Sequence, residues 1–480
     1  MVENNMMNVR FAPMIRFYNT MTATRDPFVP IEEGKVKMYA CGPTVYNFFH
    51  VGNARCFVIF DMLRRYLEYR GYEVTFVQNF TDIDDKVIRR ANEEGVGYQD
   101  IAARYIAEYF TDAKGLGVRP ATVHPLATEN IDTILDIVNA LVEKGYAYEV
   151  DGDVYFRTRR HRDYGKLSGQ AIEDLESGAR IDVNDKKEDP LDFALWKAAK
   201  PGEPSWPSPY GEGRPGWHIE CSAMVRRYLG STVDIHCGGQ DLIFPHHENE
   251  IAQSECCNGA PFANFWLHNG YINIDNRKMS KSLGNFFTVR EVAEKYGYLP
   301  IRYFLLSSHY RSPINFSEEV ISQAKAALER IFNCADSLAF YVKNAEGELR
   351  PEEEATLAAF RATRDAMIEG MDDDFNTGAG IASLFDLVGL INKATAAGAS
   401  RALALAGQEL LTEMTTLFGF VQEKEDDGDL VAWIEERIAA RAAAKREKNY
   451  AEADAIRAEL AERGVTLRDT SQGTTYTIEK

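Results

Sequence analysis

Residues 36–80 read VKMYACGPTVYNFFHVGNARCFVIFDMLRRYLEYRGYEVTFVQNF. Val36–Cys41 and Tyr72–Phe80 have the composition of strands, whereas Asn53–Tyr69 repeats large apolar residues on one helical face. Gly71 is expected to end that helix. The order strand, helix, strand predicts a parallel sheet with helices packed on its faces.

The pattern changes beyond this unit. Asp84–Glu94 and Ile131–Lys144 predict further helices, and Tyr146–Arg157 predicts a hairpin with its turn at Asp151-Gly152. Residues 163–216 are rich in glycine, proline and charge, and we expect them to be an irregular insertion. Because strand and helix signals resume at Trp217–Leu229 and Thr232–Cys237, the sheet domain is predicted to be split by this insertion.

From Ser317 onward the pattern is helical. Segments near 317–344, 352–369, 377–397 and 404–421 predict an antiparallel bundle, followed by an acidic linker at Glu423–Asp429. A small tail domain with helices near 430–449 and 450–463 and an extended piece at Leu467–Tyr476 follows.

The predicted class is α/β. It comprises a Rossmann-like parallel-sheet domain split by an insertion, a helical bundle and a small C-terminal tail domain. The predicted parts are an N-terminal extension that we expect to be disordered (1–13), the first half of the sheet domain (14–125), the insertion (126–215), the second half of the sheet domain (216–315), the bundle (316–422) and the tail (430–480).

Composition narrows the class of protein. The 480 residues are 45% hydrophobic and 26% charged, which is typical of soluble globular proteins, and we see neither a membrane span nor a secretory leader. Seven scattered cysteines without disulfide-like spacing predict a reducing, cytoplasmic setting. A net charge of −19 argues against a general polyanion binder. Arg437–Arg468 is locally positive, with eight basic and five acidic residues, although a solvated helix face is the simpler interpretation.

Two short motifs point to a triphosphate. His50-Val51-Gly52-Asn53 opens the first predicted helix, where glycine allows close approach and backbone N–H groups favour an anion. Four residues alone are weak evidence, and the alternative is an ordinary helix start capped by Asn53. Lys278-Met279-Ser280-Lys281-Ser282 offers two lysines that can stabilise a leaving pyrophosphate, although an exposed basic loop is common. Their joint occurrence is the stronger signal.

A second constellation has the residue types of a metal site. Cys41 ends a predicted strand, and Cys221 follows Gly216-Trp217-His218-Ile219-Glu220. His246 and Glu250 are spaced i, i+4 and are predicted to share a helical face. Cys, His and Glu all bind zinc, yet His246 could equally be a hydrogen-bonded core histidine. The spacing is not His-Glu-x-x-His, so a zinc protease loses its main support.

The two phosphate motifs resemble the signature pair of class I aminoacyl-tRNA synthetases, and the whole chain resembles the cysteinyl-tRNA synthetase family. The resemblance depends on six segments in order: Met38–Tyr46, Phe80–Lys86, Pro215–Met224, Gly238–Glu250, Lys278–Ser282 and Asp469–Tyr476.

The resemblance implies an activity and its reactants. The expected enzyme is a cysteine–tRNA ligase that activates L-cysteine with ATP and Mg²⁺ to cysteinyl-adenylate and transfers it to the 3′-terminal adenosine of tRNA(Cys). We expect one Zn²⁺ per subunit, a monomer and no membrane partner.

The resemblance also implies roles for individual residues. The implied zinc ligands are Cys41, Cys221, His246 and Glu250, and the amino-acid pocket is implied at Gly42, Thr81 and Trp217. ATP binding is implied for His50, Gly52, Asn53, Gly239, Asp241 and Lys281, and catalysis for His50, Asn53, Lys278 and Lys281. The residues implied to contact tRNA are Lys445, Tyr450, Asp454 and Asp469.

Zinc chemistry agrees with this implication only in part. Only about 3% of a free cysteine thiol is ionised at pH 7, and zinc both deprotonates a coordinating thiol and prefers sulfur over a serine hydroxyl. However, four protein ligands usually define a closed, structural zinc. A structural zinc therefore stays open as an alternative.

Two other functions remain open at this point. A ligase of the same fold that joins cysteine to an amino-sugar would share the zinc and ATP sites but would not need a tail domain. A zinc-stabilised RNA-binding paralogue without catalysis would be expected to have damaged ATP motifs, and we see no such damage. A pyridoxal-phosphate-dependent persulfide activity near Lys86–Arg89 rests only on a basic helix face.

Overall fold

The computed structural model describes residues 14–171, 186–274, 277–278, 287–422, 428–470 and 473–478. The chain forms two compact units: Met1–Lys325 with Ile368–Ile381, and Ala326–Met367 with Ala382–Lys480. The predicted extension at 1–13 lies outside the described residues, and the bounds of the six predicted parts stay predictions.

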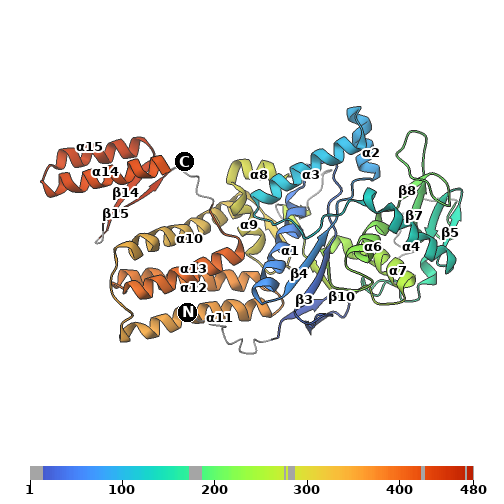
Figure 1. Ribbon diagram of the computed structural model, residues 1–480, viewed down its shortest axis with the longest axis horizontal. Coiled ribbons are helices and arrows are strands. Elements are labelled where there is room, and N and C mark those ends of the chain that lie inside the picture. Colours follow the sequence, from blue (N-terminus) through green and yellow to red (C-terminus); the bar gives the residue numbers. More distant parts are fainter. Residues whose placement is uncertain are drawn as a thin grey trace, which may run out of the picture. The chain divides into compact units, whose positions relative to one another are not determined.

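A four-stranded parallel sheet forms the centre of the first unit (Figure 1). Its order is β10-β9-β3-β4, with bounds Ala263–Asn269, Val233–Gly239, Lys35–Ala40 and Glu73–Gln78. Helix α1, Val51–Tyr69, connects β3 to β4 and buries its apolar residues. The βαβ order and the Rossmann-like sheet are confirmed.

The strand order places a topological switch between β3 and β9. From β3 the chain crosses to β4 on one side, whereas β9 pairs with β10 on the other. In open α/β sheets, the crevice outside the carboxyl ends of such strands is the usual ligand position. Cys41 directly follows β3, and Gly239 ends β9.

The helices that follow β4 include one that the sequence pattern did not predict. Helix α2, Asp85–Glu94, begins after Asp84, whose side chain accepts from the backbone N–H of Lys86 at 2.7 Å. Helix α3, Tyr98–Gly115, was not predicted, and it follows α2 after a break at Gly95–Gly97. Helix α4, Ile131–Glu143, matches its prediction.

The insertion is more regular than expected. It contains an antiparallel sheet, β5-β6-β7-β8, with bounds Ala147–Val150, Asp153–Phe156, Phe193–Ala198 and Gly213–Pro215. The hairpin turn is confirmed, because Asp151 and Gly152 have φ values of 52° and 83°. The expectation of irregular structure throughout 163–216 is wrong for β7 and β8. These strands are short and pair with residues far away in sequence, so no local periodicity reveals them.

Two helices bring the second half of the sheet domain against the insertion. Helix α6, Trp217–Tyr228, follows β8, and α7, Glu248–Asn258, follows a 3₁₀ turn at Gln240–Leu242 and a kinked turn at Ile243–His247, in which Phe244 has an extended backbone. Both contact α4.

A small second sheet and two short helices complete the unit. The sheet order is β12-β11-β13, with bounds Arg277–Lys278, Ile272–Ile274 and Ile314–Phe316. Helices α8, Val289–Tyr296, and α9, Tyr298–Leu306, lie between β12 and β13 in sequence. An N-terminal hairpin pairs β1, Arg16–Asn19, with β2, Thr24–Pro27.

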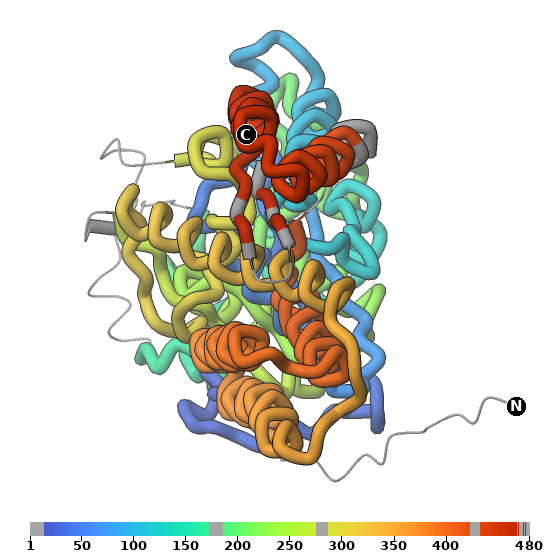
Figure 2. Tube along the Cα trace, turned by 90° about the vertical axis from the view of Figure 1, so that its left-hand side faces the viewer, coloured from blue at the N-terminus to red at the C-terminus, as the bar shows by residue number. Residues whose placement is uncertain are grey.

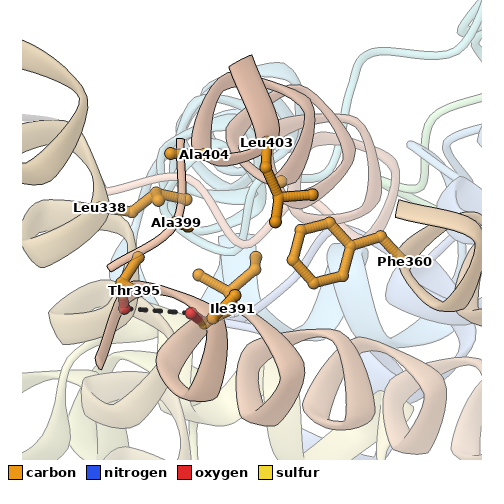
Figure 3. Close-up of a pocket in the computed structure, with 9 residues that line it drawn as sticks. Leu338, Phe360, Ile391, Thr395, Ala399, Leu403 and Ala404 are labelled. Carbon is orange, nitrogen blue, oxygen red and sulfur yellow. Dashed lines mark hydrogen bonds between the residues drawn. The ribbon is translucent and has the colours of Figure 1, made fainter. Parts of the chain in front are cut away.

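The four predicted bundle helices are confirmed. They are α10, Glu318–Asn344; α11, Glu354–Asp372; α12, Thr377–Ala396; and α13, Arg401–Phe418, and Figure 1 shows them side by side. Figure 3 shows a narrow apolar gap between them, where Leu338, Phe360, Ile391 and Leu403 converge and Thr395 Oγ1 donates to the Ile391 carbonyl at 3.0 Å.

The tail is a small α/β module with its own core. Helices α14, Gly428–Arg446, and α15, Tyr450–Glu462, lie beside the antiparallel strands β14, Val465–Thr470, and β15, Gly473–Ile478 (Figure 2). Residues 423–427 of the predicted linker lie outside the described residues, and the prediction is wrong for 428–429 because α14 begins at Gly428.

No helix in the described part of the chain is long and apolar enough to cross a membrane. All seven cysteines carry free thiols.

Candidate active site at the carboxyl edge of the sheet

Four side chains from three parts of the chain converge at the end of β3. Cys41 follows β3, Cys221 lies in α6, His246 lies in the kinked turn before α7 and Glu250 lies in α7. All four are buried, and their ligand atoms lie within 4.8 Å of one another. The four predicted metal ligands are therefore brought together, although His246 precedes α7 instead of sharing its regular helix.

The donor distances fit a zinc ion. Zinc bonds of about 2.0–2.3 Å in a tetrahedron separate neighbouring donors by about 3.3–3.8 Å. Cys41 Sγ lies 3.4 Å from Glu250 Oε1, and Cys221 Sγ lies 3.6 Å from His246 Nε2. His246 Nε2 and Glu250 Oε1 are closer, at 3.0 Å, which is an ion-pair distance. Two thiols, an imidazole and a carboxylate form a donor set that suits zinc.

The lowered pKa values of Cys221 and Glu250 favour a metal cation among the four side chains. Burial opposes ionisation of Cys221, but the contacts with Cys41 and His246 outweigh it and lower the pKa of its thiol to about 6. Burial, Cys221 and Glu250 raise the pKa of the Cys41 thiol well above its usual value. At Glu250, burial is outweighed by His236 and His246, which hold the pKa of the carboxyl well below its ordinary range. A metal cation would stabilise all the anionic forms together.

Histidines that sequence reasoning missed surround the cluster. His236 Nε2 lies 2.8 Å from Glu250 Oε2, so it can orient the carboxylate whose other oxygen faces the cysteines. His247 Nε2 lies 3.4 Å from Cys41 Sγ, and its Nδ1 lies 2.8 Å from His268 Nε2. His218 Nδ1 lies 2.9 Å from His246 Nδ1.

Two of these histidines also belong to a second, overlapping set of potential ligands. It consists of Cys41, His236, His247 and Glu250. The first set is the better zinc site, because it has two thiols and because His236 then acts on the outer oxygen of Glu250, as partners of metal ligands commonly do. Five of the nine histidines lie in this region, and only their concentration between residues 218 and 268 could have signalled it.

Trp217 and Thr81 lie beside the cluster. Trp217 is the first residue of α6, remains 40% exposed, and stacks on His246 with ring centroids 4.3 Å apart. Thr81 is buried and donates its hydroxyl to Glu220 Oε2 at 2.8 Å. Burial and the neighbouring Cys221 raise the pKa of the Glu220 carboxyl well above its usual value. The role of Glu220 was not predicted.

Gly42 is required by a close backbone approach. Its N–H donates to Asn79 Oδ1 at 2.8 Å, and a Cβ atom at this position would lie 1.5 Å from the Asn79 carbonyl oxygen. Asn79 also accepts from the Tyr39 hydroxyl at 3.0 Å. The segment after β3 is thus held against the segment after β4, beside Cys41.

The His50-Val51-Gly52-Asn53 motif forms the start of α1. His50, and not Asn53, is the N-cap: its Nδ1 accepts from the Asn53 N–H at 3.2 Å, and Asn53 Oδ1 accepts from the His50 N–H at 3.4 Å. Because Nδ1 accepts, the neutral ring carries its proton on Nε2, where it is a donor. The first turn of α1 contains no acidic residue, which suits an anion at this helix start.

The second phosphate motif lies mostly outside the described residues. Lys281 also lies outside the described residues, and of Lys278 only the backbone in β12 is described. The residues that follow the motif are attached to the start of α1: the Val51 N–H donates to the Phe287 carbonyl, and the Val289 N–H donates to the Phe49 carbonyl, both at 3.2 Å. The residues at 287–289, which follow the second motif in sequence, therefore lie beside the first motif.

The end of β9 contributes the remaining predicted ATP residues. Gly239 is its last residue, and a Cβ there would lie 2.3 Å from Asp241 Oδ1. Asp241 is exposed in the following 3₁₀ turn. Both residues therefore lie at the switch point of the sheet.

In the tail, two of the four predicted tRNA contacts bind each other. Lys445 Nζ lies 2.8 Å from Asp469 Oδ2, and the buried Arg441 holds both oxygens of Asp469 at 2.8 and 3.0 Å. Tyr450 is 63% exposed at the start of α15, and Asp454 is exposed one turn later.

Comparisons with known proteins agree with this geometry. Residues 27–326 match the model of the tRNA synthetases class I (C) catalytic domain, residues 366–422 match the DALR domain, and residues 427–476 match the cysteinyl-tRNA ligase anticodon binding domain. The cysteine–tRNA ligase of Clostridioides difficile (strain 630) is 54% identical over 96% of this chain and 99% of that protein. That of Symbiobacterium thermophilum is 53% identical, over 96% and 98%.

Solved structures agree on the fold. Methionyl-tRNA synthetase of Mycobacterium tuberculosis, in complex with methionyl-adenylate, superposes with a TM-score of 0.61 at 18% identity, covering 83% of this chain and 94% of that one. A leucyl-tRNA synthetase of Agrobacterium radiobacter has a TM-score of 0.59 at 12% identity, covering 82% and 84%. With a catalytic-domain match over more than half of its length and relatives above 50% identity along nearly all of it, this chain belongs to the cysteine–tRNA ligase family of class I aminoacyl-tRNA synthetases.

Proposed function

We propose that this chain activates L-cysteine with ATP to cysteinyl-adenylate and then transfers the cysteinyl group to the 3′-terminal adenosine of tRNA(Cys). The observation that carries this proposal is the position of two groups at the end of β3. The cluster of thiols, imidazole and carboxylate begins at Cys41, and nine residues later the helix start at His50 offers donors for an anion. A sulfur-binding group and a phosphate-binding group beside one another suit this pair of substrates.

The phosphates of ATP would be held by charge and positioned donors. The cysteine carboxylate attacks the α-phosphate and pyrophosphate leaves, so negative charge grows on the leaving group. His50, Gly52 and Asn53 are proposed to contact the phosphates from the start of α1, and Gly239 and Asp241 the adenosine side. Lys278 and Lys281 are proposed to stabilise the transition state, with Mg²⁺ bound to ATP. The absence of acidic side chains in the first turn of α1 supports this role.

The amino acid is proposed to bind between Trp217, Thr81 and the backbone at Gly42. Trp217 presents its exposed indole over His246, and Thr81 presents a hydroxyl oriented by Glu220. Cys41, Cys221, His246 and Glu250 would hold one zinc ion. When bound, zinc would supply a Lewis acid that favours the thiolate form of the substrate over an alcohol. The buried carboxylate–histidine contacts support a site whose ligands are rigidly oriented.

The second reactant is proposed to be tRNA(Cys), contacted by the tail through residues such as Lys445, Tyr450, Asp454 and Asp469. The match of residues 427–476 to an anticodon binding domain supports a tRNA ligase over an amino-sugar ligase. The exposed Tyr450 ring can stack on an unpaired base. A monomeric state and a cytoplasmic location stay predictions, and seven free thiols support a reducing compartment.

Amino-acid-dependent exchange of pyrophosphate into ATP tests this proposal. We expect exchange with cysteine and little with serine, one zinc per chain by metal analysis, and charging of tRNA(Cys). Removal of zinc with a chelator should abolish the preference for cysteine, and readdition should restore it. Equal discrimination in zinc-free protein would show that the metal is structural. A Lys281→Ala variant should lose most of its exchange rate with little change in the KM for cysteine.

A further inference from the structure

Arg55 is a buried cation just inside helix α1, two residues after Asn53. Its side chain is fully buried, and it donates to four backbone carbonyl oxygens. Nη1 reaches Tyr271 at 2.8 Å. Nη2 reaches the 309–312 segment, at Ser312 (2.6 Å), Tyr310 (3.1 Å) and His309 (3.4 Å). One guanidinium therefore joins the start of α1 to two other segments.

Both segments lead directly into the small second sheet. Tyr271 immediately precedes β11, and Ser312 lies two residues before β13. These strands are parallel, with Ile272 opposite Ile314, and β11 also pairs with β12, where Asn273 lies opposite Lys278. The clamp at Arg55 thus connects the start of α1 to the strand that carries Lys278.

The residues that follow the lysine motif are also hydrogen-bonded to the start of α1. The backbone of Val51 donates to Phe287, and that of Val289 donates to Phe49. The described residues before position 279 and after position 286 are therefore both connected to the start of α1, the former through Arg55 and the latter through backbone hydrogen bonds.

The 309–312 segment is also held from its far side. Asp374 is buried and accepts from Arg311 Nη2 at 2.6 Å and from the Tyr310 hydroxyl at 3.1 Å. Its backbone has φ of 63°, a conformation that asparagine also tolerates. Because both Arg55 and Asp374 bind the 309–312 segment, we expect this segment to hold β13, and through it β11, in position.

Burial of the Arg55 guanidinium is unfavourable in free energy. Among the described residues, no carboxylate forms an ion pair with Arg55, and its Nε has no hydrogen-bond partner. Burying a charge against carbonyl dipoles alone costs free energy that an apolar side chain would not. What the guanidinium supplies is geometry, because its rigid fork spans carbonyls from two segments at once.

We propose that Arg55 is a positioning residue that holds strand β12, which carries Lys278, in place relative to the helix-start motif. The inference rests on the proposed function, since it concerns the geometry in which both motifs act on the triphosphate. Arg55 itself touches no substrate in this proposal. Its loss should therefore reduce turnover and leave cysteine binding nearly unchanged, because the displaced groups act in the transition state.

The test compares R55K with R302K in the full chain. Arg302 is equally buried, on α9, and its Nη1 and Nη2 donate to the Leu116 carbonyl and to Asp61, which lies on α1 eight residues after Asn53. Cysteine-dependent pyrophosphate exchange is measured per active site, after titration of sites by the adenylate burst. We expect R55K to lower kcat by about 10²-fold with the KM for cysteine within about 3-fold, since a small misplacement can cost that much. R302K should lower thermal stability but retain kcat per active site.

A second variant covers the case in which R55K does not fold. D374N keeps the backbone conformation but weakens the contacts of residue 374 with the 309–312 segment. It should also lower kcat, but by less than R55K does. Full turnover per site in R55K, or equal losses in R55K and R302K, would overturn the inference alone. No cysteine-dependent exchange in the unaltered chain would overturn the proposed function, and the inference with it.

Discussion

The indole of Trp217 stacks on the imidazole of His246, with 4.3 Å between ring centroids and 30° between the ring planes. His246 at the same time directs Nε2 toward Glu250 and Cys221. One face of a candidate metal ligand is thus covered by a ring that is itself 40% exposed. Trp217 is well placed to cover a small substrate bound beside the metal ligands.

Replacing Trp217 should weaken cysteine binding specifically. We expect W217A to lower kcat/KM for cysteine by about 10–200-fold, the range typical of a lost shape contact, and to leave the KM for ATP unchanged. W217F should recover most of the loss because it restores an aromatic face. Exchange kinetics at varied cysteine and varied ATP make this measurement. A KM for ATP that rose in parallel would argue against a role in the amino-acid pocket.

Removing His236 should weaken zinc binding without removing a ligand. His236 orients the Glu250 carboxylate from 2.8 Å, and loss of such a partner typically costs 10–100-fold in metal affinity. We therefore expect H236A to lose zinc to a competing chelator about 10–100-fold more readily, and H236Q, which places an amide donor near the same point, to lose less. A C257S variant, altered outside the cluster, serves as the control for handling. Unchanged zinc affinity in H236A would contradict the assigned ligand set.

Replacing Asp469 should disturb the tail through Arg441. Three contacts, from Arg441, Lys445 and Thr474, hold the pKa of the Asp469 carboxyl far below its usual value. D469A leaves the buried Arg441 without its carboxylate, so the tail should unfold more easily and the KM for tRNA should rise. Pyrophosphate exchange, which needs no tRNA, should be unaffected. The two assays on one preparation separate a local effect on the tail from general misfolding.

Acid should weaken the helical bundle through Glu353. Its carboxylate accepts from the Ser400 N–H at 2.7 Å and from the Ser400 hydroxyl at 2.6 Å, at the start of α13, and from Arg350. Burial favours the neutral acid, but these hydrogen bonds outweigh it and lower the pKa of Glu353 to about 2.

The sign of the pH effect follows from this shift. The unfolded chain binds the proton more readily, so the stabilisation is complete above the unfolded pKa, near 4.5, and declines as pH falls toward 2. Its size should be on the order of 2 kcal/mol after allowance for solvent screening. Hydrogen exchange of α13 amides at pH 6 and pH 3 measures it. In E353Q, protection should be low at both values, and a pH dependence equal to that of the parent chain would refute the assignment.

Local patterns were sufficient wherever an element stabilises itself by contacts close in sequence. The helix after the first strand, the hairpin turn at Asp151-Gly152 and the four bundle helices all follow from periodicity and turn chemistry. The short strands β7 and β8 were missed because their partners lie far away along the chain. Helix α3, which follows α2 after the turn at Gly95–Gly97, was not predicted.

The residue types and order of the chain specified the parallel sheet, the helix-start motif and the four candidate metal ligands, since these depend on local composition and on motifs with distinctive chemistry. The tertiary structure added contacts that no sequence spacing predicts: His236 with Glu250, Glu220 with Thr81, and Arg55 with the segments at Tyr271 and Ser312. Each of these contacts joins residues that are 14 to 257 positions apart. Only chain packing brings such donors and acceptors within hydrogen-bond distance, because a side-chain contact depends on separation in space and not along the sequence.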